Sequence, residues 1–267
     1  MAMETFGNKW GLAVVILLIA TGTVWLFGAS GFRIGEGFLL VRTGSVELQY
    51  VLPEAVVFLN DEERRGKKNL DGSFSIKNIE PGTYTIMVAK EDHWPWIKKI
   101  NLSEQQVLVL HPFTISKNPK VAKVSEDDEL YLTSISSIKL ELLPTMQSKK
   151  PSIDGLTAIW LEDNAVMIEW LGDLEDLPSI FCSTSNTCDQ QIIVYSGTDT
   201  VSSIDFYLNQ TDVLLIASGN KLIVVDVDSK NVQNIQPLYE GTEPVFKVME
   251  GETLYILDAG ELYVMTL

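Results

Sequence analysis

Apolar residues follow one another without a charge over one long stretch near the N-terminus, between Lys9 and Arg33. A helix over these 23 residues would be about 35 Å long, and the hydrocarbon core of a bilayer is roughly 30 Å thick. Trp10 and Trp25 stand near the ends of its most apolar part, where interfacial aromatic residues belong. The pattern therefore predicts a transmembrane helix over residues 10–32, which would contact membrane lipid.

A cleaved signal peptide is the alternative interpretation of this stretch. Its apolar part would be about 7 to 15 residues long and would end at a small-x-small cleavage site. The apolar run is longer here, and FGASG at 27–31 is a poor cleavage site. The pattern favours an uncleaved anchor, preceded by a short cytoplasmic tail at 1–9 and followed by a linker at 33–43.

Between residues 44 and 117, apolar and polar positions alternate in short runs that are separated by turn signals such as Pro81-Gly82. A period of two is typical of strands with one buried face, and the runs show no helical period. About six or seven strands in roughly 70 residues predict a small antiparallel β-sandwich. We place this domain at 44–118.

After residue 154, pairs of apolar strands joined by short polar turns recur along the chain. Aligning Ile159, Phe206 and Phe246 gives spacings of 47 and 40 residues. Blades of a β-propeller, each with four antiparallel strands, recur at about this spacing. The pattern predicts a propeller-like domain at 155–267, in which about two and a half blades fit, although a closed propeller needs a minimum of about four.

The residues between these two regions, 119–154, are polar and are expected to form a connector with one strand around Ile138 to Leu142. Either residues 120–154 supply an irregular blade, or the stack of blades stays open and its edges need a cover or a partner. The predicted fold class is all-β, with one N-terminal transmembrane helix.

Charge is distributed unevenly and supports a domain boundary near Pro119. The net charge of the chain is −16, and residues 120–267 hold 24 acidic residues, eight lysines and no arginine. The C-terminal region therefore carries the whole net charge. Nucleic acid is excluded as a partner, because phosphate binding needs clustered lysine and arginine.

The two cysteines, Cys182 and Cys188, lie in the polar sequence FCSTSNTC. They have no further cysteine or nearby histidine with which to complete a metal site. We predict a disulfide, which implies an oxidising, extracytoplasmic compartment. Two unrelated surface thiols in a cytosolic protein are the alternative. A single-pass membrane protein with a cytoplasmic N-terminus and an extracytoplasmic body fits these features best.

Three short motifs carry a resemblance to a known family. Residues 53–61 read PEAVVFLND, residues 81–86 read PGTYTI, and residues 93–102 read HWPWIKKINL. Over roughly residues 44–113 this pattern resembles the PEGA domain, a small surface-associated β-sandwich. The glycine of the family's name is missing here, and Asp61 replaces the usual turn glycine. The resemblance implies a cell-surface role, with Trp96 as a core residue at the start of a strand.

The candidate binding residues are His93, Trp94 and Trp96. Trp94 and Trp96 stand on either side of Pro95, in the turn between two predicted strands. Trp94 is expected to be exposed, and exposed aromatic residues can stack on sugars or on partner proteins. Packing of Trp94 against the charged loop at 61–68 is the alternative.

Catalytic motifs are not evident in this sequence. It contains two histidines and has no GxSxG, HExxH or P-loop pattern. The acidic run Glu126–Glu129 lacks the turn glycine of a calcium loop and is interpreted as a solvated face. We therefore expect a protein that is not an enzyme and that uses no cofactor or metal.

These features together predict a membrane-anchored, extracytoplasmic binding or scaffold protein of the cell envelope. Its partner would be an envelope protein or a glycan, and self-association is a further option. Two alternatives are kept. One is a glycan-active enzyme that uses a pair of carboxylates, whose separation only a tertiary structure can give. The other is the ligand-sensing ectodomain of a membrane complex.

Overall fold

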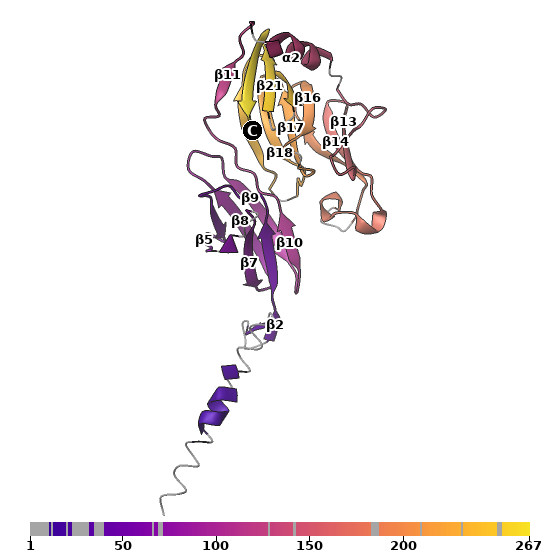
Figure 1. Cartoon of the computed structure of the whole chain (residues 1–267). Helices are drawn as coiled ribbons and strands as arrows, with labels where there is room; N and C mark the ends of the chain where they lie inside the picture. The colour runs from indigo at the N-terminus through magenta and orange to yellow at the C-terminus, as the bar shows by residue number, and fades with distance from the viewer. Residues whose placement is uncertain are drawn as a thin grey trace, which may run out of the picture. The chain divides into compact units, whose positions relative to one another are not determined.

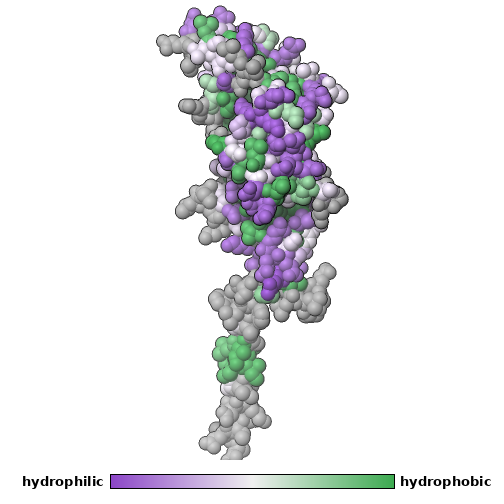
Figure 2. All heavy atoms as spheres, turned by 90° about the vertical axis from the view of Figure 1, so that its right-hand side faces the viewer, coloured by the Kyte–Doolittle hydropathy of each residue, from purple (hydrophilic) through white to green (hydrophobic). Residues whose placement is uncertain are grey.

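The computed structural model describes most of the chain. Near the N-terminus, most of the described helical residues are apolar and exposed. Val14 to Ile19 are between 51% and 65% exposed, and their apolar surface is seen low in Figure 2. No helix in the described part of the chain is long and apolar enough to cross a bilayer. The described residues are 11, 13–19, 21–22, 32–34, 40–65, 67–68, 72–127, 129–140, 143–182, 187–208, 210–230, 232–249 and 253–267.

The predicted tail at 1–9 lies outside the described residues. So do residues 10, 12, 20 and 23–31 of the helix that is predicted at 10–32. Phe32 belongs to a strand instead. Strand β1 (Phe32–Ile34) pairs antiparallel with β2 (Leu40–Arg42), so the predicted linker at 33–43 contains two paired strands.

Two compact units make up the chain (Figure 1). The first is Met1–Ile86 with Lys99–Pro112, and the second is Met87–Lys98 with Phe113–Leu267. Both units are built from β-sheets, so the predicted all-β class is confirmed. Segments 87–98 and 113–118, which the alternation pattern groups with the preceding strands, belong to the second unit.

Two four-stranded sheets contain the strands between residues 44 and 110, in the orders β10-β3-β7-β6 and β5-β4-β8-β9. Val46, Leu48 and Ile86 are fully buried, because alternate residues of each strand face the core. The prediction of antiparallel pairing is wrong for β10, which runs parallel to β3. The strands are β3 (Gly44–Leu48), β4 (Val56–Leu59), β5 (Glu62–Glu63), β6 (Lys67–Lys68), β7 (Phe74–Ile79), β8 (Gly82–Ala89), β9 (Trp96–Leu102) and β10 (Val107–Leu110).

Three antiparallel sheets of four strands form most of the second unit, and we call them sheets I, II and III. Their strand orders are β12-β13-β14-β15, β16-β17-β18-β19 and β11-β22-β21-β20. Strands β11 and β12 come from the connector and complete sheets III and I. The strands are β11 (Val121–Lys123), β12 (Lys150–Pro151), β13 (Thr157–Glu162), β14 (Ala165–Trp170), β15 (Gln191–Ser196), β16 (Val201–Phe206), β17 (Val213–Ser218), β18 (Lys221–Asp226), β19 (Ile235–Glu240), β20 (Val245–Met249), β21 (Thr253–Asp258) and β22 (Glu261–Thr266).

Two-residue turns fix the register of the central hairpin in each sheet. Asp163-Asn164 and Ala259-Gly260 have positive φ at both positions, which matches the right-handed twist of the flanking strands. Gly219 has a φ of +59° at the corresponding place in sheet II. Asparagine and glycine tolerate this conformation best, and therefore the turns stop the strands from slipping in register.

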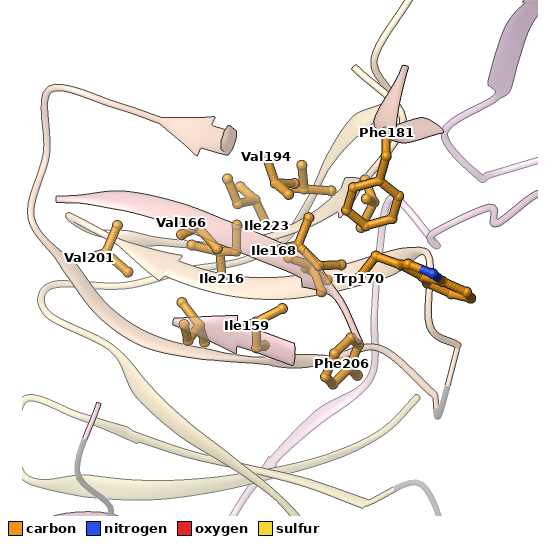
Figure 3. Close-up of a cluster of buried hydrophobic side chains, with 14 residues drawn as sticks. Ile159, Val166, Ile168, Trp170, Phe181, Val194, Val201, Phe206, Ile216 and Ile223 are labelled. Carbon is orange, nitrogen blue, oxygen red and sulfur yellow. The ribbon is translucent and has the colours of Figure 1, made fainter. Parts of the chain in front are cut away.

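Sheets I and II pack together through one cluster of apolar side chains (Figure 3). Ile159 and Ile168 of sheet I and Ile216 of sheet II are fully buried in it. All six residues of β17 are buried, as expected for a strand that is covered on both faces. Burial of one such isoleucine stabilises the fold by roughly 2 kcal/mol, so this interface is a main source of stability.

A helix covers sheet III, and it corrects the predicted connector. Helix α2 (Glu129–Leu140) occupies the region where a strand was expected around Ile138 to Leu142. Tyr131, Ile135 and Ile138 follow the i, i+4, i+7 spacing of one helical face. They pack with Leu257 and Leu262 of sheet III. The connector therefore forms two edge strands and a helix rather than an irregular blade.

A repeated motif joins each sheet to the next at the end of its outer strand. Tyr-x-Gly-Thr-acid occurs at 195–199 and again at 239–243, 44 residues later. The hydroxyl of Tyr239 donates to Asp258 Oδ2 at 3.0 Å, and Asp258 Oδ1 accepts from the backbone N–H of Thr242 and of Glu243. At the matching position, the Tyr195 hydroxyl lies 3.4 Å from the Ser218 hydroxyl.

These contacts set the ionisation of Asp258. Burial alone would raise the pKa of this carboxyl. The hydrogen bonds from Glu243, Thr242 and Tyr239 outweigh burial and bring the pKa below its ordinary value. Because the folded-state pKa is lowered, ionised Asp258 stabilises the fold above pH 4 or so, and that stabilisation is lost as the pH falls through the lowered value.

Asp258→Asn is therefore expected to lower the free energy of unfolding at pH 7 by about 1–3 kcal/mol, because an amide nitrogen replaces one of the accepting oxygens. The difference from the unmodified protein should shrink as the pH is lowered from 7 to 3, measured by urea unfolding. Asp176→Asn, at an exposed position, is the control and should change little. A difference that does not vary with pH would contradict this role for Asp258.

Candidate functional site

The structure separates the three residues that the sequence proposes as a binding group. His93 forms an antiparallel bridge with Ser116, and the backbone N–H of Trp94 donates to Ile115 O at 2.8 Å. Trp94 is 40% exposed, and the ammonium of Lys117 lies 5.3 Å from its ring centroid. Trp96 is 2% exposed and belongs to the core. His93 and Trp94 thus lie on a short ribbon made by 91–97 and 113–117, while Trp96 is not available to a ligand.

Two amide side chains hold this ribbon to sheet II. Asn234 accepts a hydrogen bond from the backbone N–H of Ile97 at 2.8 Å and donates to Ile97 O at 2.9 Å. Gln236 accepts from the N–H of Ile115 and donates to Pro95 O. Each amide offers a donor and an acceptor side by side, as a strand backbone does, and so it satisfies buried peptide groups that would be costly to leave unpaired.

A buried ion pair lies beside the amides. The Lys98 ammonium is 2.9 Å from Asp226 Oδ2 and 3.0 Å from Asp228 Oδ2, and the Lys98 side chain is 4% exposed. Burial raises the pKa of Asp226, and the charge of Lys98 offsets only part of this rise. Loss of the Lys98 charge should therefore destabilise the fold, because the carboxylates of Asp226 and Asp228 would then lie close together with little solvent and no counter-charge from Lys98.

Lys98→Met should lower the free energy of unfolding by about 3–5 kcal/mol, since it leaves Asp226 and Asp228 without their counter-charge. Lys77→Met, at an exposed position of β7, is the control and should cost under about 0.5 kcal/mol. Denaturant unfolding of both variants measures the difference. Equal costs for the two variants would show that the ion pair does not hold this segment.

A central cavity of about 280 Å³ is the better candidate for a ligand site. It lies where strands of all three sheets meet, since it is lined by residues of β12, β16 and β20 together with residues of the segment 143–149. Leu161 N donates to Pro144 O at 2.8 Å and holds this segment against sheet I. The lining residues are Leu143, Pro144, Ser148, Lys150, Ser202, Ser203, Ile204, Asp205 and Phe246.

The cavity combines an ion pair and hydroxyl groups with an apolar wall. Lys150 Nζ lies 2.8 Å from Asp205 Oδ2, and these side chains are 32% and 14% exposed. The Ser203 hydroxyl accepts a hydrogen bond from the N–H of Phe246, which leaves its own proton free to donate to a ligand. Apolar surface with a few fixed polar groups is the usual composition of small-molecule sites. At 280 Å³ the cavity suits a ligand about the size of one sugar or amino acid.

A second, more open groove of about 560 Å³ shares Ser202 with the central cavity. Asp199 and Glu243, which end the two Tyr-x-Gly-Thr-acid motifs, both line it, together with Thr242 and Asn220. The repeat therefore brings equivalent acidic residues, one from the connection between sheets I and II and one from the connection between sheets II and III, to one groove.

The predicted disulfide between Cys182 and Cys188 is confirmed, with an S–S distance of 2.07 Å. It lies in the loop between β14 and β15, which also contains the short 3-10 turns η2 (Leu174–Asp176) and η3 (Ser179–Phe181). Residues 183–186 of the loop lie outside the described residues. In the described part of the chain, histidine, cysteine and acidic side chains do not gather into a metal-binding group.

No family model and no curated protein matches this chain. Among solved structures, the chain is similar to a luciferin-regenerating enzyme, at a TM-score of 0.32 and 10% sequence identity. The match covers 79% of this chain and 62% of that one, so the chain spans less than two thirds of the other protein's length.

The expectation that the chain is not an enzyme is contradicted by this match, whose name is that of an enzyme, and we withdraw it. A likeness at this TM-score carries no argument for a particular activity in the present chain.

Sequence reasoning missed the central cavity altogether. Lys150, Asp205 and Phe246 are far apart in the sequence, and each lies on an edge strand of its sheet, so they meet only when the three sheets stack. The signal that could have located them is the 44-residue repeat of Tyr-x-Gly-Thr-acid, since the strand that follows each copy lines the cavity.

Proposed function

We propose that this chain is an extracytoplasmic binding protein of the cell envelope, and that its central cavity binds the end of a glycan. The observation that carries the proposal is the cavity lined by Lys150, Asp205, Ser203 and Phe246. A sugar ring presents hydroxyl groups that both donate and accept hydrogen bonds, and it has an apolar face of C–H groups. The Asp205 carboxylate, the Lys150 ammonium and the Ser203 hydroxyl can hydrogen-bond to the sugar hydroxyls. The phenyl ring of Phe246 can pack against the C–H face of the sugar.

The architecture supports this assignment when it is interpreted as an incomplete propeller. Strands β12, β16 and β20 would be the inner strands of three blades, and ligands of propellers bind near the axis where such strands meet. The two sheets between residues 44 and 110 would form the PEGA-like sandwich. Its role would be to space the propeller-like body from the membrane.

The location rests on two features. The disulfide of Cys182 and Cys188 is typical of an oxidising compartment. The uncharged stretch at 10–32 would tether the chain to lipid, with the N-terminus in the cytoplasm.

The exposed Trp94 favours a second candidate function, the docking of an envelope protein. Trp94 is 40% exposed beside Lys117, and tryptophan is enriched in the centres of protein interfaces. Partner binding that is lost in Trp94→Ala and unchanged in the cavity variants described next would favour this candidate over glycan binding.

The glycan proposal is tested by titrating the full chain with a panel of monosaccharides and short oligosaccharides, by calorimetry or NMR. Asp205→Asn should weaken binding about tenfold or more, through the loss of a charged hydrogen bond. Ser148→Phe should weaken it by placing a bulky ring in the lining of the cavity while the ion pair stays intact. Asp176→Asn, away from the cavity, should bind as the unmodified chain does. If binding is unchanged in both cavity variants, or if the folded chain binds no sugar, the proposal fails.

The location is tested separately on freshly isolated protein. Alkylation without reductant should leave Cys182 and Cys188 unmodified, and both should react after reduction. Carbonate washing should leave the full chain in the membrane fraction and release a variant that lacks residues 1–32. Free thiols in the fresh protein would contradict the extracytoplasmic assignment without bearing on the cavity.

A further inference from the structure

Strand β10 is an edge strand that lacks the usual protection against pairing with another chain. It is the outermost strand of its sheet and pairs with β3. Its sequence, Val-Leu-Val-Leu, contains no charge and no proline. Val107 is 62% exposed and Val109 is 42% exposed. Natural proteins rarely leave an apolar edge in this state, because its free N–H and C=O groups invite another strand.

The other edges of the two sheets in residues 44–110 differ from β10 in ways that discourage pairing. Strands β5 and β6 are two residues long and consist of glutamates and lysines, respectively. Strand β9 carries the exposed Lys99, and the peptide groups of its Ile97 are already hydrogen-bonded to the Asn234 side chain. Short length and charged residues are the common means of blocking an edge. The open state of β10 is therefore specific to this strand.

The parallel pairing with β3 determines which backbone groups of β10 face outward. Ser45 N donates to Gln106 O, and Gln49 N donates to Leu110 O, each at 2.9 Å. The N–H and C=O of one residue point to the same side of a strand, and alternate residues point to opposite sides. The peptide groups of 106, 108 and 110 therefore face β3, while those of Val107 and Val109 face away from it.

We propose that a second copy of this chain pairs with β10, antiparallel, about a two-fold axis at Leu108. In this register Val107 of each copy is opposite Val109 of the other, and Leu108 is opposite Leu108. The outward N–H and C=O groups of both valines are then all used, because each Val107–Val109 pair exchanges two hydrogen bonds. The two sheets join into one sheet of eight strands.

Side chains agree with this register on both faces. Residues opposite each other in an antiparallel pair lie on the same face, so a one-residue shift would set a valine of the exposed face against a leucine of the core face. The two-fold register avoids this mismatch. It also places Leu110 opposite Gln106 and His111 opposite Gln105, so that no like charges meet. Strand β10 is thus complementary to itself, and a partner selected by charge would find no counter-charge on it.

The contact is expected to be of moderate strength. An edge pairing of four residues on each side buries less than the standard interface of about 1,600 Å², so a dissociation constant on the order of 1–100 µM is expected. The inference does not depend on the central cavity or on what it binds.

Cysteine cross-linking of the full chain tests the register directly. Leu108 and its copy form a non-hydrogen-bonded pair, in which Cα atoms are about 4.5 Å apart, within the range of a disulfide. Leu108→Cys should therefore cross-link most of the protein as a dimer under mild oxidation. Leu110→Cys is the matched control, on the same strand and the same face. Its two copies would be about 13 Å apart, four residues along the strand, and should not cross-link. The native cysteines are already bonded to each other.

A second measurement does not depend on new cysteines. Val107→Lys adds a charge at an exposed position and should shift the full chain in detergent from dimer to monomer in sedimentation at 100 µM. Leu132→Lys, at a position that is 74% exposed on α2, should leave the dimer unchanged. Cross-linking of the two cysteine variants to an equal extent, or a monomer at every concentration, would overturn the proposal. So would a strand of another protein found on β10 in place of the second copy.

Discussion

An apolar face of a sheet must be covered, and in the second unit this applies to the face of sheet I that carries Trp160 and to the face of sheet III that carries Leu262. The chain solves this with one segment, residues 121–151. Helix α2 covers sheet III through Ile138. At the other end, Lys149 lies over the ring of Trp160 at 4.3 Å, and Trp160 is fully buried although it points away from sheet II. Without these two covers, the stack would expose the apolar faces that its strands require.

The same segment also makes the site. It contributes edge strands to sheets I and III, and in passing between them it supplies Leu143, Pro144 and Ser148 to the central cavity. A fourth sheet would cover the same faces with regular pairing. The irregular segment instead leaves a space of about 280 Å³ that polar side chains share with apolar ones. The cavity is thus a by-product of covering three sheets with a helix and an extended segment.

Local pattern was sufficient to predict most of the strands and the disulfide. Alternation located the strands between 44 and 110, and the turns at Asp163 and Gly219 follow from residues that favour positive φ. The connector was predicted wrongly because the helical face of Tyr131, Ile135 and Ile138 lies within a polar, serine-rich sequence. A period of 3.6 is hard to recognise over so short a stretch, and the apolar partner that fixes the helix is more than 100 residues away in sheet III.

The candidate site was less predictable, for a physical reason. Trp94 is 40% exposed and Trp96 is 2% exposed, as expected, but alternation along a strand is not the reason, because residues two apart lie on one face and Trp94 precedes β9. Asn234, the partner of Ile97, precedes β19, and Asp226, the partner of Lys98, ends β18, so both contacts depend on how whole sheets stack. The local sequence does not indicate that the Asn234 side chain bonds to strand backbone, or that Asp226 is buried beside a lysine. These contacts become visible only when the tertiary order of the sheets is known.

The disulfide in the loop between β14 and β15 also matters for resistance to proteases. A protease that cut the peptide between Cys182 and Cys188 would not separate the two parts of the chain, because the sulfur atoms would still join them. Strands β14 and β15 pair with each other on either side of the cut, so sheet I would keep its strand order. A molecule that is cut in this loop would therefore keep both its connectivity and the pairing of sheet I.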